Sequence, residues 1–129
     1  MFQNIEMMQM ARAMGQHVAQ RQTVVARNIA NADTPGYKAQ DLQSFEESYR
    51  SAPLQPMRAT NSRHIEAPDW SPGAARVLSQ QDGISPNGNS VSIEEEMLKA
   101  AELKRSFDLS LGIYRSAMNL MRTSIGRRV

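Results

Sequence analysis

The chain has 129 residues, enough for one domain at most, and with 5% aromatic residues we expect no large compact core. It contains no cysteine, which excludes disulfide frameworks and thiolate metal sites. The formal net charge is only +2 and no dense run of Lys or Arg occurs, so nucleic-acid binding is not expected.

No window of about 20 consecutive apolar residues occurs, so we expect no direct membrane insertion. The start, Met1–Glu6, has neither a basic segment nor a continuous apolar stretch, and therefore does not resemble a cleaved signal peptide. All six prolines fall between residues 35 and 86. This partition predicts one domain with three segments: an N-terminal core helix at 1–33, a turn and extended or irregular middle at 34–90, and a C-terminal core helix at 91–129.

The first predicted helix runs from about Gln3 to Ala32, because apolar residues recur there at heptad spacing. The seam becomes polar at Arg21 and Asn28, and polar residues at such positions often set the register or the partner of a coiled coil. Its members are Met7, Ala11, Met14, Val18, Arg21, Val25, Asn28 and Ala32.

The segment Asn28–Tyr37 is expected to end this helix in a sharp turn. Pro35 lacks an N–H group and disfavours helical geometry at Thr34, so the helix should stop near Asp33. Pro35 and Gly36 fit the two central positions of a type II turn. The short polar side chains can cap the last helical carbonyls or bind a neighbouring chain. From geometry alone, a plain helix end followed by a turn is the favoured interpretation.

The middle of the chain gives weaker signals. Asp41–Tyr49 is interpreted as a short helix or an extended arm, and a short β segment is possible around Arg76–Leu78. Prolines at 53 and 56 interrupt the chain, and Ser71–Gly73 and Ser85–Asn89 are predicted to be turns.

The C-terminal helix has the stronger pattern. Ser92 and Glu95 form a capping box at its start, and the Glu94–Glu96 run complements the positive end of the helix dipole. Alternating spacings of four and three residues then predict a helical seam over Ile93, Met97, Ala100, Lys104, Phe107, Leu111, Tyr114, Met118, Met121 and Ile125.

We therefore predict a mainly α fold, in which the two terminal helices pack as an antiparallel coiled-coil hairpin around an irregular or short-β middle segment. Two helices alone leave much of each apolar face in water, so further helices from other subunits are expected. The residues assigned to helix packing are Met14, Val18, Val25, Met97, Phe107, Leu111, Tyr114, Met118, Met121 and Ile125.

Catalytic and metal sites are not expected. His64 has only His17, which lies on a predicted helix, as a possible histidine partner, so His64 is interpreted as solvated or packed. Four acidic residues, Asp33, Asp41, Glu46 and Glu47, are expected to be solvated. Trp70 is either a packing anchor or an interface contact. No phosphate-binding loop, nucleophile elbow or zinc spacing is present, so neither enzymatic activity nor a cofactor is predicted.

The string Asn28–Tyr37 resembles the N-terminal signature of the flagellar basal-body rod and hook family of axial proteins, and all ten positions match. Thr60–Ile65 and Asn87–Met97 are similar to the corresponding segments of proximal-rod members. Family members have heptad helices at both ends of the chain, which pack together in the core of a helical tube.

The resemblance implies a structural subunit of the proximal rod, which transmits torque from the inner-membrane ring to the distal rod and hook. It implies export through the flagellar type III apparatus into the periplasmic space without a cleaved signal peptide. The implied partners are other rod subunits, the ring-to-rod adaptor protein and the inner-membrane ring protein. An inter-subunit role is then expected for the turn residues Asn28, Asn31, Asp33, Thr34, Pro35, Gly36 and Tyr37. The alternative is a cytoplasmic coiled-coil adaptor or export chaperone.

Overall fold

The computed structural model describes residues 2–50, 76–79 and 85–126. Helix α1 spans Phe2–Ala30 and helix α3 spans Ile93–Gly126. Between them lie strand β1 at Gln40–Leu42, helix α2 at Phe45–Arg50 and strand β2 at Val77–Ser79. In the described part of the chain, no helix is long and apolar enough to span a membrane.

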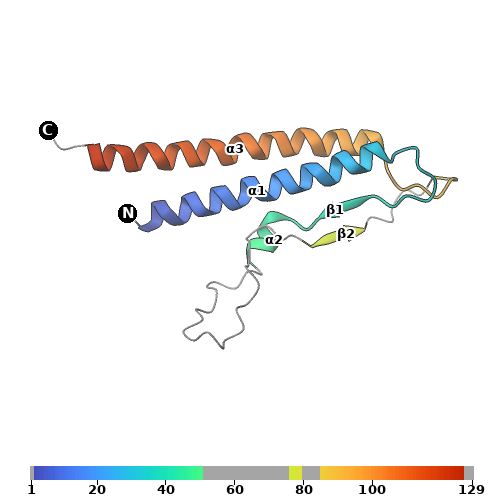
Figure 1. Cartoon of the computed structure of the whole chain (residues 1–129), viewed down its shortest axis with the longest axis horizontal. Coiled ribbons are helices and arrows are strands. Elements are labelled where there is room, and N and C mark those ends of the chain that lie inside the picture. Colours follow the sequence, from blue (N-terminus) through green and yellow to red (C-terminus); the bar gives the residue numbers. More distant parts are fainter. Residues whose placement is uncertain (1, 51–75, 80–84, 127–129) are drawn as a thin grey trace, which may run out of the picture.

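Helices α1 and α3 run antiparallel and lie side by side over most of their length (Figure 1). We call the end where α1 stops and α3 starts the closed end, and the end that carries both chain termini the open end. The predicted mainly α hairpin is therefore confirmed, and its middle segment contains short β structure.

Strands β1 and β2 form a two-stranded antiparallel sheet, in which Asp41 faces Leu78 across the pair. Strand β1 lies along α1 and buries Leu42, whereas β2 is exposed throughout. Helix α2 begins at a reciprocal cap, because the Ser44 hydroxyl donates to Glu47 Oε2 (3.2 Å) and accepts from the Glu47 N–H (3.4 Å). The segment predicted as a short helix or an extended arm thus contains both.

The apolar core of the hairpin is small. Val18 and Val25 of α1 pack on Leu103 of α3, with Ala100 beside them. Farther toward the open end the helices approach closely, since a Cβ added to Gly15 would lie 3.5 Å from Ser110 Oγ. A core of this size agrees with the expectation from composition.

The face that α3 turns toward α1 differs from the predicted one. Its buried residues recur at intervals of seven: Glu96, Leu103, Ser110 and Ala117. The predicted seam positions lie one or four residues after these, and Met97, Phe107 and Ile125 are 63%, 46% and 73% exposed. Tyr114 and Met118 are also exposed, while Leu111 and Met121 are partly buried. Within one chain, mostly small and polar residues of α3 make the close contact with α1. The seam predicted from hydrophobic spacing therefore does not identify the residues of this contact.

On α1 the predicted seam agrees better with the burial. Val18 and Val25 are buried, and Met14 is partly buried. The helix ends at Ala30, two residues before the expected Ala32. Some predictions fall outside the described residues: the Thr60–Ile65 segment, His64, Trp70, the prolines at 53 and 56 and the Ser71–Gly73 turn.

Candidate functional site: the closed end of the hairpin

The Asn28–Tyr37 segment folds as predicted at its turn. The N–H of Tyr37 donates to the carbonyl of Thr34 over 3.2 Å, and Gly36 has φ +73°. This is the conformation of a type II turn, in which positive φ at the third position favours glycine. The side chain of Asn31 caps its own helix by donating to the carbonyl of Arg27 (2.8 Å), and Thr34 donates to Asn31 Oδ1 (3.3 Å).

This turn docks on the loop that precedes α3. The Gly36 N–H donates to the Asn87 carbonyl (3.0 Å), and the Ser90 N–H donates to the Tyr37 carbonyl (3.1 Å). Gly88 has φ +80°, and a Cβ added there would lie 3.4 Å from the Cα of Gly36. Two glycines therefore let the two backbones touch.

Asn89 caps the turn that follows α1, from across the loop. Its buried side-chain amide lies within hydrogen-bonding distance of three carbonyls, those of Asn31 (2.9 Å), Ala32 (2.7 Å) and Thr34 (2.8 Å). Its Oδ1 accepts from the Val91 N–H at 2.7 Å. These carbonyls belong to the turn directly after α1, so this one side chain joins that turn to the approach to α3.

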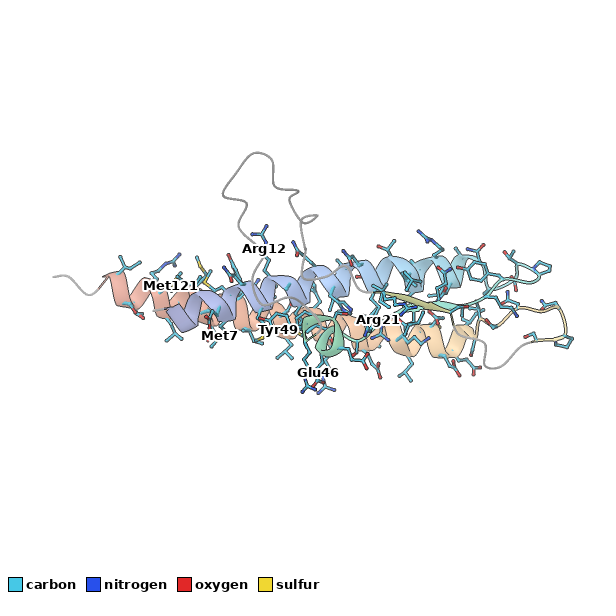
Figure 2. All side chains as sticks on the ribbon, turned by 90° about the horizontal axis from the view of Figure 1, so that it is seen from below. Met7, Arg12, Arg21, Glu46, Tyr49 and Met121 are labelled. Atoms are coloured by element: carbon cyan, nitrogen blue, oxygen red, sulfur yellow. The ribbon has the colours of Figure 1, made fainter. Side chains whose placement is uncertain are left out.

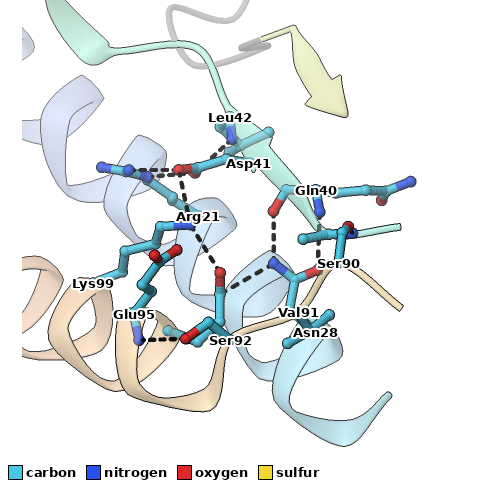
Figure 3. A network of polar contacts seen from close by, with 12 residues as sticks. Arg21, Asn28, Gln40, Asp41, Leu42, Ser90, Val91, Ser92, Glu95 and Lys99 are labelled. Carbon is cyan, nitrogen blue, oxygen red and sulfur yellow. Dashed lines mark hydrogen bonds and ion pairs between the residues drawn. The ribbon is translucent and has the colours of Figure 1, made fainter. Parts of the chain in front are cut away.

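Asn28 is fully buried and links three segments of the chain (Figure 3). Its Nδ2 donates to the Gln40 carbonyl (2.7 Å) and to Glu96 Oε2 (3.1 Å). Its Oδ1 accepts from the Gln40 N–H (3.1 Å) and from the Tyr37 hydroxyl (3.3 Å). The Asn28 amide thus makes with Gln40 of β1 the two hydrogen bonds that a neighbouring strand would make, and it also binds Glu96 of α3.

The carboxylate of Glu96 is buried at the first turn of α3. Besides Asn28, it accepts from Lys99 Nζ at 2.8 Å, and this ammonium lies 3.9 Å from Asp41 Oδ2. The predicted cap at the start of α3 is present as a 3.5 Å contact from the Glu95 N–H to Ser92 Oγ. The Glu94–Glu96 run therefore has two roles: a helix start, as predicted, and a buried contact through its third residue.

Arg21 and Asp41 form a two-point ion pair between α1 and β1. Arg21 Nε and Nη2 lie 2.6 Å and 2.7 Å from the two carboxylate oxygens, and the Leu42 N–H donates to Asp41 Oδ1 at 2.7 Å. Burial disfavours the charged carboxylate, but the hydrogen bonds and charge of Arg21, with help from Leu42 and Lys99, outweigh it and lower the pKa of Asp41. The same pair raises the pKa of Arg21.

The prediction that Asp41 is solvated is therefore wrong, because this carboxylate is buried against α1. His17 is packed: its Nε2 lies 2.8 Å from the Gln43 carbonyl and its ring meets Phe45 edge-on at 5.7 Å. His17, Arg21 and Asn28 thus form a polar stripe on α1 that binds residues 40–43.

We call the Arg21, Asn28, Asp41, Glu96 and Lys99 side chains the closed-end network. Each of its two carboxylates contacts a cation, and its four formal charges cancel. The described residues contain no group of three or more His, Cys, Asp or Glu placed to hold a metal ion. This arrangement is suited to joining chain segments.

Sequence reasoning found Arg21 and Asn28 as unusual polar seam positions, but it missed Asn89 as a cap, and Glu96 and Lys99 as network members. Segment Asn87–Met97, which contains the first two, resembles the corresponding segment of proximal-rod members. The other residues of the turn motif remain at the surface: Asp33, Thr34, Pro35 and Gly36 are exposed, and Tyr37 is partly buried.

The open end has a different character. A groove of about 330 Å³ runs between α1 and α3, lined by Ala11, Arg12, Gly15, Phe107, Ser110, Leu111 and Tyr114. Met7 and Met121 lie beyond it toward the chain termini (Figure 2). Leu109, Leu120 and Ile125 are more than half exposed, so large apolar side chains surround the hairpin here.

Comparison with known proteins identifies the family of the chain. The family model described as "Flagella basal body rod protein" matches residues 16–38, which contain the polar stripe of α1 and the whole turn motif. The flagellar basal body rod protein FlgB of Agrobacterium fabrum is 33% identical over 129 residues, covering 97% of this chain and 96% of that protein. The chain belongs to the flagellar basal body rod proteins.

Other relatives agree with this membership. FlgB of Escherichia coli K12 is 32% identical, covering 81% of this chain and 85% of its own length. FlgB of Aquifex aeolicus is 30% identical, and the match covers 84% of this chain and 83% of that protein. The chain is therefore a structural component of the flagellar basal body, associated with other rod components, as its sequence predicted.

Proposed function

We propose that this rod protein is a non-catalytic subunit of the proximal rod, which carries torque from the inner-membrane ring toward the distal rod and hook. The observation that carries the proposal is the unused apolar surface of the hairpin. Met97, Leu98, Leu109, Leu120 and Ile125 are each more than half exposed, although they lie on one of the two core helices. An exposed apolar surface of this extent is typical of a protein that binds others through it.

The closed end supports the same proposal through its contacts within the chain. Torque transmission needs a subunit whose elements do not slide under load. The closed-end network and the Asn89 cap join α1, β1 and the start of α3 by side-chain hydrogen bonds and ion pairs. The hairpin is therefore held at one end by its own chain, while its apolar flanks remain available for neighbouring helices in a helical tube.

The turn motif is divided between two roles in this proposal. Asn28 is fully occupied inside the chain, whereas Asp33, Thr34 and Pro35 are exposed at the tip of the closed end. The exposed three are proposed to contact a neighbouring subunit, and Asn28 to hold the turn at the correct angle for this contact.

The proposed neighbours are other rod subunits, the ring-to-rod adaptor protein and the inner-membrane ring protein. The proposed route is export through the flagellar type III apparatus to the periplasmic space, without a cleaved signal peptide. The alternative of a cytoplasmic coiled-coil adaptor or export chaperone has no support in the comparisons. Purified basal bodies distinguish the two, because recovery of the chain only from the cytosol would contradict the rod proposal.

The Phe107→Asp variant tests the apolar surface. Phe107 is 46% exposed and contributes little to the small core, so the isolated chain should stay folded while burial against a neighbour becomes unfavourable. Cells carrying it are expected to be non-motile and to lack complete rods. Asn119→Asp is the matched control, since it adds the same charge at an exposed polar site of α3. Normal swimming and complete basal bodies in Phe107→Asp cells would refute the assignment of this surface.

A further inference from the structure

The apolar contact between α1 and α3 selects their register only weakly. The α3 residues buried against α1 recur every seven residues, and among them Leu103 is the single large apolar side chain in the described part of the helix. Ser110 and Ala117 are small. A shift of α3 by one heptad along α1 would bring small or apolar residues back to the same places, so packing alone discriminates little between the two registers.

Glu96 breaks this repeat, because it is the fourth buried member and carries a charge. In a register shifted by one heptad toward the closed end, Leu103 would lie opposite Asn28 and Glu96 would lose the amide that binds it at 3.1 Å. Lys99 would move with Glu96, away from Asp41 and its 3.9 Å contact. A shift in the opposite direction would place residue 89 opposite Asn28, before α3 begins at Ile93.

We infer that the Asn28–Glu96 contact, supported by Lys99, Asp41 and Arg21, is a register lock that selects one heptad alignment of α3 on α1. The lock is local to the closed end, and it sets the alignment of the whole hairpin because both helices are continuous to the open end (Figure 1). It thereby fixes which apolar residues of the two helices lie beside one another. This inference does not depend on the proposed function.

A register role and a merely stabilising role predict different effects when Asn28 and Glu96 are both replaced by apolar residues. Exchanging a buried polar pair for apolar side chains often leaves the stability of the fold unchanged or raises it. The same exchange removes the energetic penalty for a misaligned register. The double variant Asn28→Leu with Glu96→Leu should therefore keep the hairpin but loosen its register. Glu96→Gln keeps an acceptor for the Asn28 amide and should keep the register.

The absence of cysteine from the sequence allows the register to be read by disulfide cross-linking. Gly15→Cys with Ser110→Cys reports the observed register, since a Cβ at Gly15 lies 3.5 Å from Ser110 Oγ. Gly15→Cys with Ala117→Cys reports the shifted one. Seven residues correspond to roughly 10 Å along a helix, beyond the Cα separation of about 7 Å that a disulfide tolerates. Each pair is introduced into the full chain, oxidised and scored by non-reducing electrophoresis.

With Asn28 and Glu96 present, we expect the observed-register pair to cross-link at least about ten times more than the shifted pair. In the double-leucine background, the shifted pair should gain several-fold, and Glu96→Gln should behave like the native sequence. Retention of the observed register alone in the double-leucine chain would overturn the lock. Loss of the first cross-link without gain of the second would also overturn it, because the contact would then only stabilise. If neither pair cross-links in the native background, the two helices hold no fixed register, and the lock is overturned in this case too.

Discussion

The closed and open ends of the hairpin bury their helix faces in different ways. At the closed end, Asn28, Asn89 and Glu96 are almost completely buried, and each has hydrogen-bond partners within the chain. At the open end, the helices meet through small residues such as Gly15 and Ser110, and the larger apolar side chains point outward. The first region satisfies its buried polar groups within one chain, whereas the second presents a groove and apolar side chains that a single chain does not cover.

This difference indicates a division of labour in an assembly subunit. Buried hydrogen bonds require specific partners at specific positions, so they define a conformation before any neighbour arrives. Apolar surface is less directional and can pack against helices of several subunits. The following substitutions test the contrast between the two ends.

Asn28→Ala should have the largest effect on the stability of the isolated chain. It removes four hydrogen bonds and leaves Glu96 buried without its amide partner, so we expect a loss of about 3 kcal/mol in the free energy of unfolding. Urea unfolding followed by circular dichroism measures this change. Asn31→Ala is the control, because Asn31 is only partly buried and its two side-chain hydrogen bonds, to the Arg27 carbonyl and from Thr34, are exposed; its loss should be about 1 kcal/mol or less. Equal losses for both variants would contradict the special role of Asn28.

Asp41→Asn should cost about 2 kcal/mol near neutral pH, between the values for exposed and buried ion pairs. Since folding lowers the pKa of Asp41, its stabilisation is fully present above the ordinary Asp pKa of about 3.9 and is lost as the pH falls through the folded value. The difference between native chain and variant should therefore shrink below about pH 4. Urea midpoints measured at several pH values provide the test. A difference that stays constant down to pH 2 would argue against the ion pair as its source.

Gly88→Ala should cost about 1–2 kcal/mol, because alanine is strained at φ +80° and its Cβ would press on Gly36. Gly36→Ala, at φ +73° with open space around its Cβ, should cost about 1 kcal/mol from backbone strain alone. Gly112→Ala, in the exposed part of α3, should instead stabilise the chain by about 0.5–1 kcal/mol. Thermal melts of the three variants give the order of their stabilities. If Gly112→Ala also destabilised the chain, this result would contradict the contrast between the two ends.

Ile125→Ser should have the smallest effect on the isolated chain, within about 0.5 kcal/mol, because this side chain is 73% exposed. In cells the same change should reduce swimming if a neighbouring subunit covers the open end. Urea unfolding and swimming-halo diameter measure the two effects. A variant that unfolds at clearly lower urea concentration would show that Ile125 already packs within its own chain.

The sequence predicted most of the fold and part of the site. The long heptad patterns and the proline-free ends identified α1 and α3, and Pro35-Gly36 identified the turn, because both signals are local. The alignment of α3 on α1 was not predictable from hydrophobic spacing. A close helix contact favours small residues: Glu96 and Ser110 carry no hydrophobic signal, and Ala117 carries a weaker one than the large apolar residues around it.

The closed-end network was hidden for a related reason. Its members come from positions far apart in the sequence, such as Asn28 and Glu96, and each looks like an ordinary surface residue on its own. Only the polar interruptions of the first seam, Arg21 and Asn28, gave a local sign. Their partners became apparent once β1 and the start of α3 were placed beside α1.

Hydrogen exchange of the purified chain tests the contrast between the two ends most directly. Amides at the closed end, around residues 24–42 and 89–103, should exchange slowly because the network and the small core both lie there. Amides of the open end, around residues 5–12 and 114–126, should exchange much faster in the isolated chain and become protected in purified basal bodies. Uniform protection along both helices of the isolated chain would contradict the account, as would faster exchange at the closed end.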